Sequence, residues 1–301
     1  MFGSTLNNDP KLLAFTDSVQ DASHRAGFLS ARTYNFTFRT ALQRVIDDAG
    51  VAGLPLPEVG QRMLAWWGSP ELGRPGNIKE AIAALLSPDL YEYQEYLKYR
   101  NNCQQPNPPT SLKSDIETRL TWQATSEFGL MLLRGRTMET CGSACIGWDW
   151  QRIEETVQEI YSRIESVDTQ LRKIPQENIY RWLLGILYRY RLRGALGHPY
   201  LFDLAQKGYW GKAPFGRAIP GREVHPGQTR FQPKLMVTRA EKKHDFLFGA
   251  TSGNTQPWHI RWTHRALDRP ITEAEAIDLL RLLYEVAESK QVIFRLHDDG
   301  K

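Results

Sequence analysis

The sequence has few of the features that would place it outside the cell or within a membrane. Its 301 residues include three cysteines, an odd number that does not fit the disulfide framework of a secreted protein. No apolar run is long enough to cross a bilayer, and the N-terminus lacks a basic stretch followed by an apolar core. We therefore expect a cytoplasmic chain that does not contact a membrane.

The motifs of common ATPases are also missing. There is no G-x-x-x-x-G-K-[ST] loop and no acidic D-E-x-[DH] segment. The segment "GYWGKA" at 208–213 contains Gly and Lys, but at the wrong spacing and without a following Ser or Thr. We expect the chain by itself to be inactive as an ATPase and to bind no cofactor.

Metal-binding and hydrolase patterns are equally sparse. Cys141 and Cys145 form C-x-x-x-C, but zinc needs two further ligands, so we predict buried, metal-free cysteines. The seven histidines form no H-E-x-x-H. Asp17, Asp21 and His24 lie close together in the sequence, yet no nucleophile motif such as G-x-S-x-G accompanies them. We predict no catalytic residue and no metal site.

One part of the sequence is strongly basic. Between Arg181 and Arg265 there are 15 Lys and Arg against 4 Asp and Glu, an excess of +11, whereas the remaining residues carry 23 against 30. A basic block with interleaved aromatic residues favours a nucleic-acid surface. The candidate phosphate contacts are Arg191, Arg193, Lys212, Arg217, Arg222, Arg261 and Arg265, and the candidate stacking residues are Tyr209, Trp210, Phe215 and Phe231. A solvated basic face over a core that holds these aromatics would give the same pattern.

Hydrophobic periodicity predicts a mostly α-helical chain with minor β structure. Ile153, Val157, Ile160 and Ile164 share one helix face, and Thr272 with Glu275 forms a capping box. The expected helices cover 31–50, 60–68, 76–100, 111–135, 150–166, 177–194, 256–267 and 270–291, with loops at 54–60, 101–111 and 207–234 and a candidate strand at 141–150.

Both ends of the sequence contain a candidate strand beside helices. At the front, Leu12–Phe15 fits a buried strand, and a helix with Ser18 and Asp21 as its capping box and Gly27 at its C-cap follows. A helix N-terminus there could bind a phosphate, although an ordinary capped helix explains the pattern equally well. At the end, two helices precede "VIFRLHDDG", an order typical of a winged helix.

The front stretch "LLAFTDSVQDASHRAGF" resembles helicase motif IV, F-[ST]-D-x-x-Q-D-A, of large superfamily-two DEAD/DEAH-box DNA helicases, many of them from bacterial defence clusters. The match runs through Phe15, Thr16, Asp17, Gln20, Asp21 and Ala22, with Val19 where many members have Arg. A second stretch, "RLTWQATSEFGLMLLRGRTMETCGSA", is similar to an E-F-x-L … R-[ST]-L-E-x-x-G region of the same proteins, with Met138 where Leu is usual.

The resemblance implies a DNA-binding helicase fragment. Residues 1–50 would begin a second RecA-like α/β lobe, 51–150 a helical insertion, and 151–301 a basic winged-helix-like region. Thr16, Ser18, Gln20 and Arg25 would contact the DNA backbone. ATP and Mg²⁺ would bind elsewhere in the parent helicase, on a lobe supplied by a companion polypeptide, because this chain lacks the first lobe and motifs V and VI. The last helix has an acidic outer face, so we expect DNA contact through Arg261 and Arg265 of the preceding helix, or through the basic block.

Two alternatives belong to other functional classes. The chain could be a stand-alone winged-helix DNA-binding or adaptor protein without enzymatic activity. It could also be a protein-interaction module whose basic block meets an acidic partner. An adjacent reading frame that encodes the Walker motifs would favour the split helicase over both.

Overall fold

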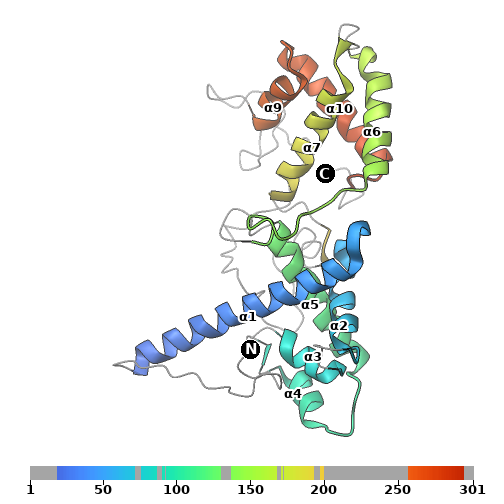
Figure 1. The fold of residues 1–301 in the computed structure, drawn as a ribbon. Helices are drawn as coiled ribbons and strands as arrows, with labels where there is room; N and C mark the ends of the chain where they lie inside the picture. The colour runs from blue at the N-terminus through green and yellow to red at the C-terminus, as the bar shows by residue number, and fades with distance from the viewer. Residues whose placement is uncertain are drawn as a thin grey trace. The chain divides into compact units, whose positions relative to one another are not determined.

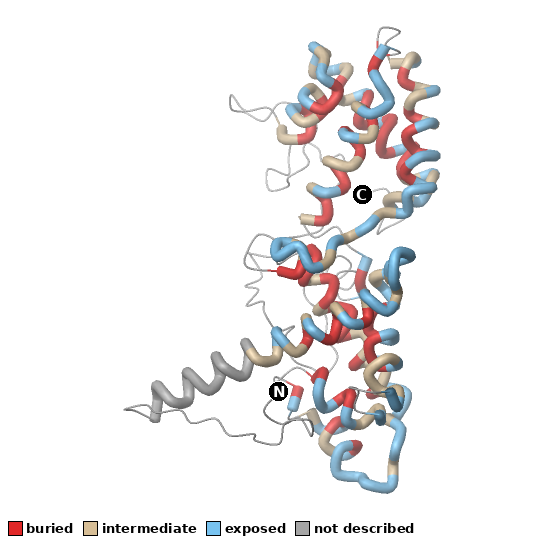
Figure 2. The backbone as a smooth tube through the Cα atoms, viewed as in Figure 1, coloured by how far each residue is buried: buried red, intermediate tan, exposed pale blue. Residues whose placement is uncertain are grey.

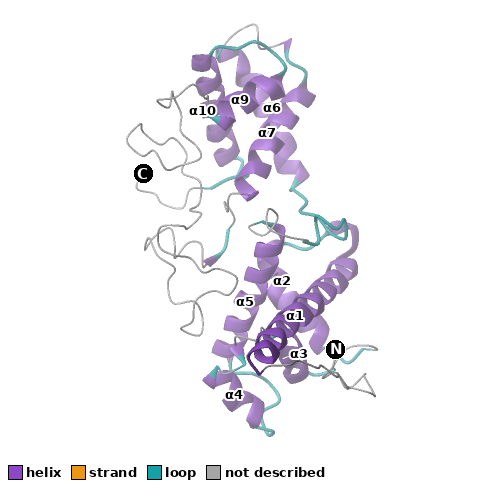
Figure 3. Ribbon diagram, turned by 90° about the vertical axis from the view of Figure 1, so that its left-hand side faces the viewer, coloured by secondary structure: helices purple, strands orange, loops and turns teal. Residues whose placement is uncertain are grey.

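The computed structural model describes residues 19–71, 76–86, 90–91, 93–129, 137–167, 171, 173–192, 197–199 and 257–294, with side chains from residue 33 onward. Every regular element in this part is a helix, which confirms the mostly α prediction (Figure 1; Figure 3). None of the described helices combines the length and the apolar character that crossing a bilayer requires. The chain divides into two compact units. Among the described residues, unit 1 comprises those up to Cys145 together with 198–199, and unit 2 comprises Ile146–Gly197 together with 257–294, so neither unit is continuous in the sequence.

The described part of unit 1 contains five α-helices. They are α1 (Val19–Ala49), α2 (Val59–Gly68), α3 (Ile78–Leu85), α4 (Gln94–Asn101) and α5 (Thr110–Phe128). Helix α2 packs against α1, α3 and α5, and their inward side chains form the core, which includes Leu42, Met63, Ile82 and Leu112 (Figure 2). Short 3-10 turns at Gly50–Ala52 and Leu56–Glu58 lie in the proline-rich connection before α2.

A glycine allows α2 and α5 to pack closely. A Cβ atom on Gly60 would lie 1.9 Å from the carbonyl oxygen of Glu117, well inside van der Waals contact. The Gly60 N–H donates to Thr121 Oγ1 at 3.0 Å. A residue with any side chain would therefore push the two helices apart.

Glu127, near the end of α5, ties three parts of unit 1 together. Its carboxylate accepts hydrogen bonds from Arg39 of α1, at 2.8 Å from Nε and 3.2 Å from Nη2. It also accepts one from the backbone N–H of Met138 at 2.8 Å. Glu127 thus connects α5 to α1 and to the loop that begins at residue 137.

Four α-helices lie in the described part of unit 2. They are α6 (Trp150–Arg163), α7 (Gln176–Leu192), α9 (Trp258–Leu267) and α10 (Glu273–Ser289). As predicted, Ile153, Val157 and Ile160 are buried on one face of α6, and Ile164 is buried in the 3-10 turn that follows it. The predicted capping box of α10 is confirmed, because the Thr272 hydroxyl accepts from the Glu275 N–H and the Glu275 carboxylate accepts from the Thr272 N–H.

Helices α7 and α9 run antiparallel in close contact. Arg181 near the start of α7 binds the carbonyl of Ala266 near the end of α9, whereas Arg189 lies over the ring of Trp258 at the start of α9. Between these contacts, a Cβ atom on Gly185 would lie 2.1 Å from Cζ2 of Trp262. The absence of a side chain at Gly185 thus leaves room for the Trp262 indole to pack against α7.

Several local predictions are wrong. Helix α1 continues through Gly27, because one interior glycine costs only about 1 kcal/mol relative to alanine. The expected helix over 76–100 is broken, since α3 ends at Leu85 and α4 begins at Gln94. The candidate strand at 141–150 is turn and loop up to α6.

The expected strand after α10 is also not formed in its described part. Val292 and Ile293 instead donate their N–H groups to the carbonyl of Ala287, which closes the end of α10, and Gln291 takes a positive φ of 56°. The candidate strand Leu12–Phe15 and the cap residue Ser18 lie outside the described residues.

Candidate nucleic-acid interface

The outer surface of α7 and α9 combines arginines with aromatic rings. We call it the α7–α9 face and define it by Arg181, Tyr188, Arg189, Trp258, Arg261, Trp262 and Arg265. Every cation of the two helices is an arginine, since neither α7 nor α9 contains lysine. A guanidinium can donate two parallel hydrogen bonds to one phosphate, which an ammonium group cannot do.

Arg261 and Arg265 are the most accessible cations of this face. They are four residues apart on α9 and both are exposed. No carboxylate of the described residues lies within ion-pair distance of either guanidinium. Two like charges one turn apart repel each other by a few tenths of a kcal/mol. The pair therefore gains from a polyanion that neutralises both charges.

The other two arginines of the face have structural contacts as well. The Arg181 guanidinium donates to the carbonyls of Arg265 and Ala266 at the end of α9, where backbone acceptors lack helical partners. The Arg189 guanidinium lies 5.0 Å from the centroid of the Trp258 ring. These contacts hold positive charge at both ends of the α7–α9 contact.

The two tryptophans fix the backbone of α9 against α7. Their rings stack at 5.7 Å with 6° between the planes, and Trp262 Nε1 donates to the carbonyl of Trp182 at 3.0 Å. Beneath them, the buried indole of Trp182 donates to Thr263 Oγ1, which in turn donates to the carbonyl of His259. The arginines thus extend from a rigidly packed pair of helices.

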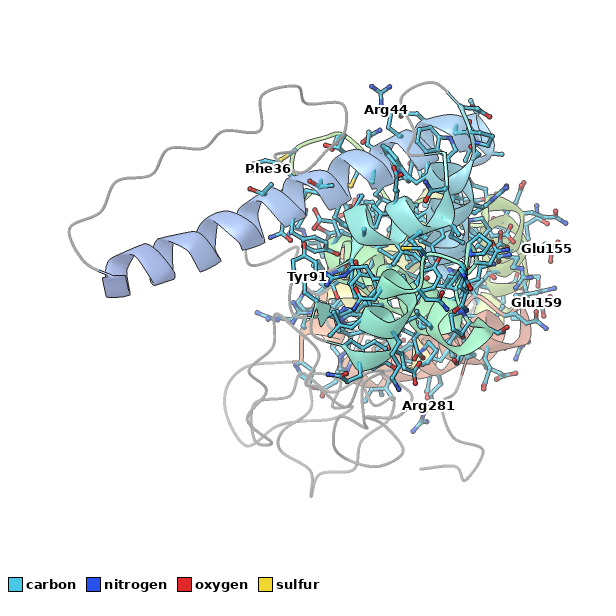
Figure 4. The ribbon with its side chains drawn as sticks, turned by 90° about the horizontal axis from the view of Figure 1, so that it is seen from below. Phe36, Arg44, Tyr91, Glu155, Glu159 and Arg281 are labelled. Atoms are coloured by element: carbon cyan, nitrogen blue, oxygen red, sulfur yellow. The ribbon has the colours of Figure 1, made fainter. Side chains whose placement is uncertain are left out.

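The other two described helices of unit 2, α6 and α10, carry exposed acidic side chains. Glu155 and Glu159 project outward from α6 (Figure 4), and Asp278 and Glu285 are exposed on α10. Part of this charge is neutralised locally. Arg163 pairs with Glu285 at 2.8 Å, and Arg281, also labelled in Figure 4, pairs with Asp278 at 3.1 Å. A polyanion would meet repulsion here and attraction on the α7–α9 face.

The structure describes only part of the predicted DNA-contacting set. Arg261 and Arg265 are exposed on α9, as a phosphate contact requires. Arg191 is only 4% exposed, with its guanidinium 4.9 Å from the centroid of the Tyr188 ring, so it offers little surface to a phosphate. Gln20 and Arg25 lie in α1, in the part whose side chains are not described. The predicted residues Thr16, Ser18, Arg193, Lys212, Arg217 and Arg222, and the aromatics Tyr209, Trp210, Phe215 and Phe231, lie outside the described residues.

Five members of the face were not among the predicted contacts. They are Arg181, Tyr188, Arg189, Trp258 and Trp262. The W-x-x-x-W spacing of "WHIRW" places two aromatic rings one helical turn apart, and it contains the signal that would have found the stack. The arginines of α7 gave no such signal, because their proximity to α9 depends on tertiary packing.

The three cysteines do not form a metal site. All of them are exposed, so the prediction that Cys141 and Cys145 are buried is wrong. The loop instead folds around the buried Met138, whose carbonyl accepts hydrogen bonds from the backbone N–H and the hydroxyl of Ser143. Nowhere in the described ranges do three metal-ligating side chains come together.

Unit 1 holds a buried histidine. His198 is 1% exposed and lies against Trp122 of α5, with 5.0 Å between ring centroids. Its Nε2 lies 3.2 Å from the carbonyl oxygen of Thr118, and because that oxygen can only accept, Nε2 carries the proton. Burial lowers the pKa of His198 to about 4, against the smaller opposing effect of this hydrogen bond. The imidazole is therefore neutral at physiological pH, and it anchors residues 197–199 on α5.

The chain was compared with protein families, curated proteins and solved structures. The chain matches no protein-family model, no curated protein and no solved structure.

Proposed function

We propose that the protein binds nucleic acid, and that the α7–α9 face is the described part of its phosphate-binding surface. The observation that carries this proposal is the exposed Arg261 and Arg265 pair, which lacks a carboxylate partner in the described part of the chain. Arg181 and Arg189 add positive charge on the neighbouring helix. The acidic side chains of α6 and α10 favour one orientation, with the α7–α9 face toward the polyanion.

At a finer level, we propose that the nucleic acid is DNA and that the chain is a fragment of an ATP-dependent DEAD/DEAH-box helicase. Its role would be to grip or separate strands while a companion polypeptide carries the ATP-binding lobe. The support is the motif IV resemblance at Phe15–Ala22 and the basic composition of residues 181–265. In this proposal residues 1–50 begin a RecA-like lobe, and α9 and α10 belong to a winged helix.

The proposal is tested by the salt dependence of binding. Fluorescence anisotropy with a labelled DNA oligonucleotide should show affinity that falls steeply with salt, because neutralised phosphates release counterions. The double variant Arg261→Ala/Arg265→Ala should bind roughly 10- to 100-fold more weakly, since each charge-assisted hydrogen bond contributes about 1.5–3 kcal/mol in full contact and less at an exposed site. The slope of log affinity against log salt should also shrink by about 2.

A matched control is Arg152→Ala/Arg281→Ala. It removes the same two charges from exposed sites of unit 2, but there the guanidiniums pair with Asp149 and Asp278. Its affinity should equal that of the wild type. Equal losses in both double variants would show a response to net charge alone and would contradict the assignment of the face.

Removing negative charge from α10 tests the proposal in the opposite direction, because it should not weaken DNA binding. Neutralising Glu273 and Asp278 of α10 to Gln and Asn should leave DNA affinity unchanged or raise it. Loss of binding in a variant that remains folded would contradict the proposed orientation. Binding of an acidic protein, with no affinity for DNA at low salt, would instead favour the protein-interaction alternative.

A further inference from the structure

Tyr188 is an exposed aromatic residue among the arginines of α7. Its side chain is 47% exposed, whereas Trp182 and Tyr190 of the same helix are buried. Single exposed aromatics are ordinary on protein surfaces, so the surroundings of Tyr188 matter more than its exposure. It lies seven residues, close to two helical turns, after Arg181, and therefore on the same side of α7.

The ring of Tyr188 is held in place from one side. The guanidinium of Arg191 lies 4.9 Å from its centroid, and Arg191 is itself only 4% exposed. A buried cation over one face restrains the ring, so a base that stacks on Tyr188 would lie on the other face. A flat, fixed and partly open aromatic ring is the kind of surface on which a nucleic-acid base stacks.

The tryptophans of the same face are less available for such stacking. Trp258 and Trp262 stack on each other, and Arg189 lies over the Trp258 ring. Among the aromatic side chains of the described α7–α9 face, Tyr188 is exposed, whereas Trp258 and Trp262 are both partly buried. Its neighbour Arg189 and the arginines of α9 supply the cations that would follow the backbone of the same strand.

From this arrangement we infer that the α7–α9 face binds single-stranded nucleic acid, with one unstacked base lying on the ring of Tyr188. The inference rests on the proposed function and adds the class of ligand. In a duplex both faces of each internal base are covered by neighbouring base pairs, so no base is free to stack on a protein ring. A single strand offers its bases without that cost, and stacking of this kind tolerates any sequence.

The test compares strands that have the same charge but differ in their bases. Wild-type protein is titrated at one fixed salt concentration with a labelled DNA single strand, an abasic phosphodeoxyribose strand of equal length, and a hairpin duplex whose loop is abasic. We expect roughly 5- to 100-fold tighter binding of the normal strand than of the abasic strand, the range that stacking of one base gives. The hairpin should bind no more tightly than the abasic strand.

The variants assign that preference to Tyr188. Tyr188→Ala should bind the normal and abasic strands equally, with unchanged affinity for the abasic strand. Tyr188→Phe should keep the preference, because stacking needs the ring and not the hydroxyl. Arg261→Ala/Arg265→Ala should weaken binding of both strands by the same factor and leave their ratio intact.

Failure of this inference differs from failure of the proposed function. Equal, salt-dependent binding of normal and abasic strands by the wild type would overturn the stacking inference and leave phosphate binding standing. A preference for the hairpin, or an equal loss on both strands in Tyr188→Ala, would also overturn it. Absence of binding to any of the three probes at low salt would overturn the proposed function itself.

Discussion

Both units have a glycine at a close contact between two helices, but the group that faces the glycine differs between them. In each, a glycine lets two helices approach closely, Gly60 between α2 and α5 and Gly185 between α7 and α9. In unit 1 the glycine faces the backbone of Glu117, which cannot move without moving a helix. In unit 2 it faces the indole of Trp262, a side chain that can rotate. Unit 1 therefore tolerates a larger side chain at its glycine less well than unit 2 does.

The polar contacts differ in the same sense. Unit 1 joins its helices through an ion pair, Arg39 with Glu127, and the glutamate is nearly buried. Unit 2 uses a buried neutral hydrogen bond between Trp182 and Thr263, and its ion pair between α6 and α10, Arg163 with Glu285, is exposed. Removing one partner of a buried charge pair leaves the other uncompensated, which costs more than the loss of a neutral bond.

The largest effect is expected for Gly60→Ala. Its methyl group would overlap the Glu117 carbonyl, so the free energy of unfolding of unit 1 should fall by about 3 kcal/mol or more. Amide hydrogen exchange, followed in peptides from each unit, should show loss of protection in α2 and α5. Gly68→Ala is the control, because a Cβ there meets Ile78 at an ordinary 3.5 Å. A neutral Gly60→Ala variant would contradict the distinction between the units.

The next effect is expected for Glu127→Ala. It leaves Arg39 and the Met138 N–H without their acceptor, so we expect a loss of about 2–3 kcal/mol in unit 1. Urea denaturation measures it. Glu117→Ala, a nearby glutamate of α5 that makes only a longer 3.7 Å pair with Lys113, should cost well under 1 kcal/mol. Equal losses in the two variants would show that the Glu127 contacts add nothing specific.

Gly185→Ala should cost less, about 1–2 kcal/mol. The clash with Trp262 is partly relieved by rotation of the indole, and alanine gains up to about 1 kcal/mol of helix propensity. In a Trp262→Leu background the same substitution should become neutral or stabilising, which a double-mutant cycle measures. If the cost persisted without the indole, the collision would lie with the backbone, as in unit 1.

The smallest effect concerns pH and His198. Its pKa is lowered to about 4 in the folded protein, so the unfolded chain, with a pKa near 6.5, binds more protons between these values. The stability that neutral His198 contributes is present above about pH 6.5 and is lost as the pH falls toward 4. Between pH 6.5 and 5.5 the loss should be about 1 kcal/mol. Urea titrations of wild type and His198→Gln should differ by this amount, and parallel pH profiles would exclude the effect.

Local sequence patterns predicted the helices well. The Thr272 and Glu275 capping box and the isoleucine face of α6 follow from contacts within one helix, so spacing alone identifies them. The predictions that Arg191 contacts a phosphate and that Cys141 is buried were not met. The burial of a side chain depends on which other parts of the chain pack beside it, and local spacing does not show that. The candidate site shows the same division. Arg261 and Arg265 were predicted from charge, whereas Arg181 and Arg189 join them only through the packing of α7 on α9.

The discontinuity of unit 2 has a consequence for how the protein is made. Helix α7 ends at Leu192 and α9 begins at Trp258, so the residues that complete its core are synthesised much later. Translation adds about 5–20 residues per second, so α9 and α10 are synthesised several seconds after α7. The apolar face of α7 stays uncovered by these helices for that time. During that interval Trp182, Ile186 and Leu187 lack their final neighbours. A nascent chain halted within this stretch should therefore expose apolar surface that a chaperone can bind, and one released after α10 should not.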